Sequence, residues 1–176
     1  MKKLLLIATT LFSVVGFTAE TKSNSLFSSL ENPHPNYSWM FNVGTSRMAD
    51  INGYDYSASG ITASALYSFK NFSNRLSAGL GFSHYDYQNY GGNFQFISAL
   101  GEFRVIQADL YGNTKLFSSL TTGLNYGMND GSGSRSTFNY GVALGVQFNE
   151  QIGMRFDIKS GRNITTASGL SLVGYY

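Results

Sequence analysis

Most of the sequence alternates between large apolar residues and small or polar residues with a period of two, and this pattern restricts the chain to β-strands. The clearest case is STFNYGVALGVQFN at residues 136–149, where every second residue from Phe138 to Phe148 is large and apolar or aromatic. The residues between them are Asn, Gly, Ala and Gln. Successive side chains of a strand point to opposite faces of the sheet, so this segment has one apolar face and one small, polar face. We therefore predict an all-β protein.

Polar, glycine-rich segments divide the alternating region into strands. Short turns are predicted near residues 71–74, 115–119 and 149–151, and longer loops near 49–57, 88–93, 129–136 and 161–165. Turns and loops alternate along the chain, and bacterial membrane barrels have short periplasmic turns and longer outer loops. An even number of strands returns both ends of the region to the turn side. The eight predicted strands cover residues 37–48, 58–70, 75–87, 94–114, 119–128, 137–149, 151–160 and 166–176.

The fourth predicted strand is about twice as long as the ~9–11 residues that cross a membrane as a strand. Its alternation also changes phase around residues 101–104. We expect its C-terminal half to be the membrane part, with Gln107 and Asp109 inward, and its N-terminal half to project beyond the bilayer or to hold a bulge. The alternative is that this segment forms two strands, which would give nine.

The polar face of the predicted strands distinguishes a membrane barrel from a soluble sandwich. A soluble sandwich would carry Lys, Glu and Asp on the face that meets water. Here that face is mostly Gly, Ser, Thr, Asn and Gln, and only 12% of all residues are charged, against about 25% in an average protein. Small residues fit the interior of a narrow eight-stranded barrel. The predicted fold is an eight-stranded antiparallel up-and-down transmembrane β-barrel with its apolar face toward lipid.

The N-terminal residues have the layout of a secretory signal peptide, because Lys2 and Lys3 precede an apolar run. We expect residues 1–19 to be removed, with cleavage after Gly16 as the alternative to cleavage after Ala19. Residues 20–36 are then a polar periplasmic lead, and residues 37–176 form the barrel. Removal of residues 1–19 takes two of the 12 basic residues and none of the 10 acidic ones, which leaves a formal charge of zero.

Two groups of side chains stand out on the predicted strands. Inward-facing charges should pair in a narrow lumen, because an unpaired buried charge is costly. Aromatic residues gather toward both rims, where the two interfaces of a membrane favour them. The predicted lumen charge network is Arg75, Asp109, Arg155, Asp157 and Lys159, and the predicted aromatic girdle is Tyr37, Trp39, Phe69, Phe117, Phe148, Tyr85, Tyr87, Tyr140 and Tyr176, with Tyr54, Tyr56, Phe138 and Tyr175 also near the rims.

The last segment, SGLSLVGYY at residues 168–176, alternates like a complete membrane strand and ends in an aromatic residue. Together with the signal peptide and the alternation of residues 37–176, it resembles the small eight-stranded outer-membrane β-barrel proteins of Gram-negative bacteria. The resemblance implies that the C-terminal strand is recognised by the barrel-assembly machinery. The sequence departs from the family pattern at Gly174, where a large apolar residue is usual, and at Tyr176, where Phe is usual.

Candidate catalytic residues are few. Ser83 and His84 are neighbours, but adjacent strand residues point to opposite faces, so they cannot form a nucleophile–base pair. His84 is predicted to face outward, where it could meet a serine of a neighbouring strand such as Ser98. His34 is a lone polar residue, no metal-ligand spacing occurs, and the chain has no cysteine. We expect no enzyme activity, no cofactor and no metal.

These features predict a monomeric integral outer-membrane protein with a sealed lumen and a structural, envelope or surface-contact role. Its partners are outer-membrane lipids and lipopolysaccharide, and nucleic acid is excluded because the basic residues are scattered singly. The alternative functions are a narrow channel for small or hydrophobic solutes and, third, an enzyme that modifies lipid A. The sequence gives no indication of a ligand or a surface partner.

Overall fold

The computed structural model describes residues 37–51, 57–70, 75–88, 92–110, 113–129, 133–161 and 164–176. Within these ranges no helix is long and apolar enough to cross a membrane. The predicted signal peptide, its cleavage site and the periplasmic lead lie outside the described residues and stay predictions. The strands are β1 (Trp39–Ile51), β2 (Ala58–Ser68), β3 (Leu76–Tyr87), β4 (Asn93–Asp109), β5 (Lys115–Asn129), β6 (Gly133–Gln147), β7 (Ile152–Gly161) and β8 (Ile164–Tyr175).

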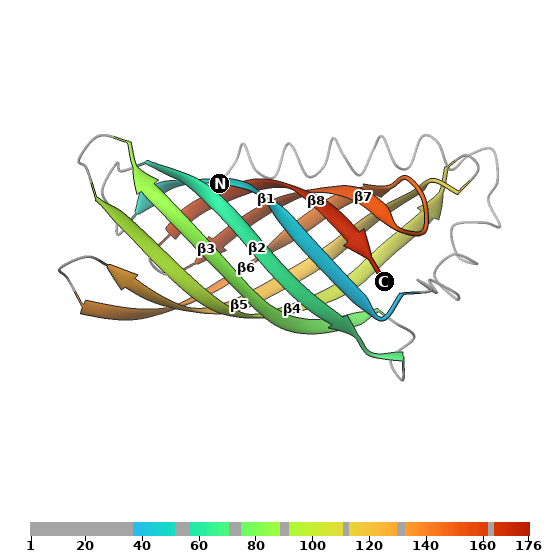
Figure 1. Cartoon of the computed structure of the whole chain (residues 1–176), viewed down its shortest axis with the longest axis horizontal. Coiled ribbons are helices and arrows are strands. Elements are labelled where there is room, and N and C mark those ends of the chain that lie inside the picture. Colours follow the sequence, from blue (N-terminus) through green and yellow to red (C-terminus); the bar gives the residue numbers. More distant parts are fainter. Residues whose placement is uncertain are drawn as a thin grey trace.

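The eight strands form one closed antiparallel barrel, which confirms the predicted fold class. Each strand pairs with its neighbours in sequence, and β8 pairs with β1 from Met40↔Tyr175 to Ile51↔Ile164. Backbone hydrogen bonds from the amides of Ser38 and Trp39 to the carbonyl of Tyr176 extend this seam, with N···O distances of 2.7 and 2.8 Å. Figure 1 shows the strongly tilted strands and the C-terminal end beside the start of β1.

The barrel has two ends, which are named here by the connections they carry. The turn end holds the connections at residues 69–75, 110–114 and 148–151 together with residues 37 and 176. The loop end holds the connections at residues 52–57, 88–92, 130–132 and 162–163. The prediction of markedly longer loops at one end is wrong, because the strands at the loop end extend further than predicted. The polar, glycine-rich residues Gly133–Ser136, for example, were assigned to a loop but pair with β5.

Burial confirms the two faces of the strands. On β3, Leu80 is 66% exposed while Ser77 is 6% exposed, and on β8 the neighbours Leu172 and Val173 differ in the same way. Large apolar side chains therefore cover the outside of the barrel, and small polar side chains line the lumen. Most of the buried apolar residues that point inward belong to two clusters, one at each end of the lumen, and Phe117 and Ala143 are buried outside these clusters.

β4 is one strand with a bulge between Arg104 and Ile106, so the count of eight is confirmed and the nine-strand alternative is excluded. Residues 93–103 pair with β3 along almost its whole length, so both halves of β4 belong to the closed sheet, and the assignment of its C-terminal half to the membrane stays a prediction. The turn that follows β4 was misplaced. It lies at residues 110–114 rather than 115–119, because β5 already begins at Lys115, which pairs with Asp109 of β4.

Candidate functional site

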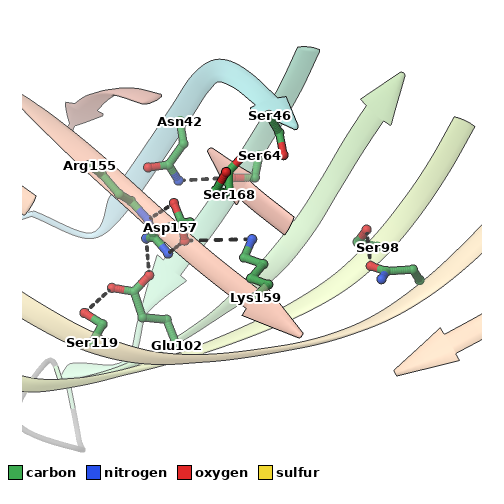
Figure 2. Close-up of polar contacts among 11 residues, drawn as sticks. Asn42, Ser46, Ser64, Ser98, Glu102, Ser119, Arg155, Asp157, Lys159 and Ser168 are labelled. Carbon is green, nitrogen blue, oxygen red and sulfur yellow. Dashed lines mark hydrogen bonds and ion pairs between the residues drawn. The ribbon is translucent and has the colours of Figure 1, made fainter. Parts of the chain in front are cut away.

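A cluster of charged side chains crosses the lumen between β7 and β4 (Figure 2). Arg155 lies at its centre, because the alternation of β7 turns it and Asp157 inward. The guanidinium donates to both carboxylate oxygens of Asp157, from Nε at 2.8 Å and from Nη2 at 2.7 Å. Its Nη1 donates to Oε2 of Glu102 on β4. Two carboxylates therefore share one arginine in a closed part of the lumen.

Neighbouring side chains complete this cluster. The Ser119 hydroxyl of β5 donates to Oε1 of Glu102 at 2.7 Å, and Nζ of Lys159 lies 3.8 Å from Oδ1 of Asp157. Arg155 and Glu102 are almost fully buried, whereas Lys159 is partly exposed. Buried charges are tolerated when each one is paired and hydrogen-bonded. The arrangement links strands β4, β5 and β7 by ion pairs and hydrogen bonds.

Aromatic and apolar residues close the lumen at the turn end. Tyr37, Met40, Leu66, Val173 and Tyr175 form a buried cluster, and the rings of Tyr37 and Tyr175 are 4.5 Å apart. Because Tyr37 precedes β1, it is the N-terminal end of the barrel region that folds into the lumen. Burial raises the pKa of the Tyr37 phenol.

Phe117 and Arg104 extend this closure across the lumen. The Arg104 guanidinium carbon is 4.4 Å from the centroid of the Phe117 ring and 5.6 Å from that of Tyr37. Its Nη1 donates to Oε1 of Gln107 at 3.0 Å. The Phe117 ring lies directly over Gly145, where a Cβ atom would overlap Cζ of the ring. Together the residues that close this end form the turn-end plug, which consists of Tyr37, Met40, Leu66, Arg104, Phe117, Val173 and Tyr175.

A second apolar cluster narrows the lumen at the loop end. Its buried members are Met48, Ala58, Tyr85, Phe94 and Ala167, and Tyr87 and Phe96 pack against them. The rings of Tyr85 and Phe94 stack with their centroids 5.2 Å apart. All of these residues come from β1, β2, β3, β4 and β8, so this cluster covers one side of the loop end.

Between the two clusters lies a cavity of about 100 Å³. Its walls include Glu102, Arg155, Asp157 and Lys159 of the charged cluster. The rest of the wall is mostly hydroxyl and amide side chains, among them Asn42, which donates to the hydroxyl of Ser64 at 3.0 Å (Figure 2). The barrel thus holds a polar space with an apolar closure on the turn side.

The predicted lumen network is found in part. Arg155, Asp157 and Lys159 lie together as predicted. Arg75 and Asp109 do not join them. Arg75 precedes β3 at the turn end, and Asp109 is exposed because it is the last residue of β4 and lies at the rim. Within the described residues, neither side chain takes part in an ion pair.

Glu102 and Arg104 were missed by the sequence analysis, because the change of phase in β4 was placed at residues 101–104. The bulge lies after Arg104, so regular alternation from Ser98 keeps both residues inward. Charge counting offered a signal. Arg155, Asp157 and Lys159 give one carboxylate for two cations, and a buried cluster of that composition lacks an acidic partner.

The predicted aromatic girdle is also found in part. Trp39, Phe69, Phe148, Tyr140 and Tyr176 are exposed on the outside of the barrel. At the turn end, Trp39, Phe41, Tyr67, Phe69 and Tyr176 form a chain of contacting rings over β8, β1 and β2, with centroid distances of 5.2–6.1 Å. Tyr54 and Tyr56 lie outside the described residues.

Four girdle residues, together with Tyr175 from the other residues near the rims, were assigned wrongly, because closeness to a rim does not determine which face a side chain occupies. Tyr37 and Phe117 belong to the turn-end plug, as does Tyr175. Tyr85 and Tyr87 belong to the loop-end cluster, since they have the same inward phase as Ser77 and Ser83 on β3.

The predicted encounter of His84 with Ser98 is wrong. Ser98 is buried in the lumen and donates to Oδ1 of Asn125 at 2.7 Å, whereas Nε2 of His84 lies 3.4 Å from Oδ1 of the exposed Asp86. The two side chains are on opposite faces of the wall. Within the described ranges, no group of three or more His, Cys, Asp or Glu residues is arranged to hold a metal ion.

No known family model matches the sequence, and no curated protein is significantly similar to it. Solved structures do match. Neisserial surface protein A matches with a TM-score of 0.55 at 14% identity, over 77% of this chain and 94% of the other. The Ail attachment invasion locus protein of Yersinia pestis has a TM-score of 0.44 at 15% identity over 78% and 96% of the two chains. The N-terminal barrel domain of Pseudomonas aeruginosa OprF has 0.44 at 13% over 80% and 98%.

The match to Neisserial surface protein A extends over nearly all of that protein and includes the closed eight-stranded sheet. At this level of identity it establishes the architecture. The chain has the fold of the small eight-stranded outer-membrane β-barrels.

Proposed function

We propose that this chain is a monomeric, non-enzymatic protein of the bacterial outer membrane, with a structural, envelope or surface-contact role. The exposed apolar side chains carry this proposal. Every one of the eight strands exposes large apolar residues, from Val43 on β1 to Leu172 on β8. A soluble monomer rarely exposes an apolar patch larger than a few hundred Å². A continuous apolar band around a closed barrel is suited to the hydrocarbon of a membrane, where backbone groups must all be paired.

The outward aromatic residues support a defined position in the bilayer. The chain of rings from Phe69 to Tyr176 lies at the turn end, where tyrosine and tryptophan can meet lipid headgroups. Arg47, His84 and Asp86 lie outside the barrel on β1 and β3, near the loop end. Charged groups are costly at the bilayer midplane but are tolerated near the interface. We propose that the turn end, which holds residues 37 and 176, faces the periplasm and that the loop end meets lipopolysaccharide and the surroundings.

The closed turn end supports a sealed barrel rather than a channel. Phe117 and Tyr175 are each 1% exposed, and they fill the lumen together with Tyr37 and Met40. Interiors of eight-stranded barrels are normally filled by side chains. His84 and Ser98, the pair considered from the sequence, lie on opposite faces of the barrel wall, so this pair does not support a lipid-modifying enzyme.

Membrane fractionation and gel migration test this proposal. The protein should be recovered in the outer-membrane fraction, and its unboiled form should migrate differently from its boiled form on a detergent gel. Recovery in the soluble periplasmic fraction would contradict the assignment. Lipid A analysed by mass spectrometry should be identical with and without the protein, and a changed lipid A would support the enzyme alternative instead.

A narrow channel is the second candidate, and the polar cavity favours it. The cavity already occupies the middle of the lumen, so only the turn-end plug would separate it from the periplasmic side. Single-channel recording in planar bilayers distinguishes the two functions. A sealed barrel gives no steps of conductance, and reproducible steps with the purified wild-type protein would favour the channel.

A further inference from the structure

The cavity in the lumen is lined mainly by groups that can both donate and accept hydrogen bonds. Ser46, Thr62, Ser64 and Ser83 line it from β1, β2 and β3, and Asn139 lines it from β6. These inward side chains are only half-buried, in contrast to the fully buried turn-end plug. Hydroxyl groups and amides favour a partner that also offers both donors and acceptors.

The charges around the cavity cancel one another. Two cations, Arg155 and Lys159, face two carboxylates, Glu102 and Asp157, and all four line the cavity. The donors of Arg155 that face these carboxylates are engaged, and Lys159 is held toward Asp157. A charged guest would have to compete with these pairs, whereas an uncharged one would not. The electrostatics of the site therefore favour a neutral ligand.

Three polar side chains of the cavity wall each have an oxygen atom that can form a further hydrogen bond. Oδ1 of Asn42, Oγ1 of Thr121 and Oδ1 of Asn139 are buried and have no hydrogen-bond partner within the described part of the chain. Asn42 and Thr121 are 7% and 8% exposed and lie on β1 and β5. A buried polar group without a partner is destabilising. The last torsion of an asparagine side chain is soft, so Asn42 and Asn139 can turn toward a guest.

The size of the cavity limits the guest. An apolar cavity of about 150 Å³ holds benzene, which has six non-hydrogen atoms, so a cavity of about 100 Å³ suits a guest of about four to six. We propose that the lumen is a one-ended binding pocket for a small, uncharged, polyhydroxylated molecule of about the size of glycerol, entered from the loop end. The inference relies on the sealed lumen of the proposed function only for its closed turn side.

The route of entry follows the polar side of the loop end. The loop-end cluster comes from β1–β4 and β8, and no described residue of β5, β6 or β7 belongs to it. On that side the lumen wall carries Asn125 and Thr137, which are hydrogen-bonded to each other at 3.3 Å, and the partly exposed Lys159. A hydroxylated solute passing these residues exchanges water for protein hydrogen bonds, whereas the loop-end cluster on the other side presents mainly apolar surface.

Cysteine labelling of the folded barrel in micelles tests accessibility, and the natural chain has no cysteine to interfere. The probe is 2-hydroxyethyl methanethiosulfonate, a small neutral reagent. Thr62→Cys, and Ser64→Cys as a second position, should react, and Val173→Cys in the turn-end plug should not. Glu150→Cys in the exposed β6–β7 connection is the fully accessible control. Failure of both Thr62→Cys and Ser64→Cys to react overturns the pocket, whereas reaction of Val173→Cys instead overturns the sealed turn end of the proposed function.

Protection by glycerol tests the ligand class. Glycerol should slow the labelling of Thr62→Cys along a saturation curve, about twofold at half-occupancy, and leave Glu150→Cys unchanged. Adding Thr121→Val, which preserves shape but removes a cavity hydroxyl, should move the curve to higher glycerol concentration. Thr45→Val makes the same change on the exposed face of β1 and should leave the curve in place. Labelling that glycerol does not slow in a saturable way means that the pocket holds water only and overturns the proposal.

Discussion

Asp157 pairs with Arg155 and Lys159 of its own strand, and Arg155 links it to Glu102 on β4. It accepts two hydrogen bonds from Arg155, which also pairs with Glu102, so loss of its charge leaves surplus positive charge in a closed space. We expect Asp157→Asn to lower the free energy of unfolding by about 3–5 kcal/mol, as for other broken buried pairs. Urea unfolding in micelles measures this. Asp86→Asn, at a carboxylate that is 71% exposed, should change stability by about 0.5 kcal/mol or less.

Equal losses in these two asparagine variants would show that Asp157 is hydrated in the lumen and that its ion pairs contribute little. A second result follows from the sealed lumen. If the turn-end plug closes the barrel, Asp157→Asn stays non-conducting in planar bilayers even though it is less stable. A channel would instead keep its stability and change its ion selectivity.

Gly145 shows how a missing side chain makes room for a ring. A Cβ atom there would overlap Phe117 and approach the carbonyl oxygen of Met154 to 2.7 Å, so even alanine does not fit without movement. At Gly169, a Cβ atom would meet its nearest atom, the carbonyl oxygen of Thr45, at 3.1 Å. We expect Gly145→Ala to cost about 1–3 kcal/mol, the usual cost of overpacking, and Gly169→Ala clearly less. Urea unfolding of the two variants side by side measures the difference, and the opposite order would contradict the packing of Phe117.

At the scale of the strand, the outward face of β3 tests which solvent surrounds the barrel. Leu80 is 66% exposed and is flanked by Ala65 on β2 and Ala99 on β4. In a bilayer, Leu80→Arg should cost about 2–4 kcal/mol, as for arginine near the midplane, and Leu80→Ala should cost less. Around a water-soluble barrel, the arginine would be within about 0.5 kcal/mol of wild type. Unfolding in lipid vesicles measures the change, and tolerance of Leu80→Arg there would show that this face does not meet lipid.

Strands with unbroken alternation were predictable from the sequence, and strands with a local irregularity were not. In β7, every second residue faces inward, so Arg155, Asp157 and Lys159 could be placed together from the sequence alone. In β4, the bulge after Arg104 moves the phase by one residue, and a reader of the sequence cannot tell on which side of Glu102 the change occurs. Backbone pairing with β5 decides this, and it depends on residues far away in the sequence.

The ends of the strands were also beyond the sequence pattern. Polar, glycine-rich residues at 133–136 resemble a loop, yet they continue β6 because β5 offers them partners up to Asn129. Tyr37 illustrates the same limit at a single residue. Its aromatic character suggested an interfacial position facing lipid. In the structure the Tyr37 ring instead lies in the lumen, packed against the ring of Tyr175, with the centroids 4.5 Å apart.

At the scale of the whole molecule, closure of the sheet and closure of the lumen have separate causes. The sheet closes because β8 pairs with β1, which leaves no unpaired strand edge. The lumen closes because the side chains of Tyr37, Phe117 and Tyr175 converge at the turn end from three places in the chain. A barrel can therefore keep its sheet and lose its seal.

Replacing Tyr37, Phe117 and Tyr175 together by alanine removes three rings from the turn-end plug and should connect the polar cavity to the turn side. We expect the triple variant to give steps of conductance in planar bilayers where the wild-type protein gives none. Replacing Trp39, Phe69 and Tyr176 by alanine removes as many rings from the outside of the same end, and this variant should give no steps of conductance. Both triples are compared as folded protein, identified by the shifted migration of the unboiled form. Equal conductance from the two variants would mean that general loosening of the barrel, rather than loss of the plug, admits ions.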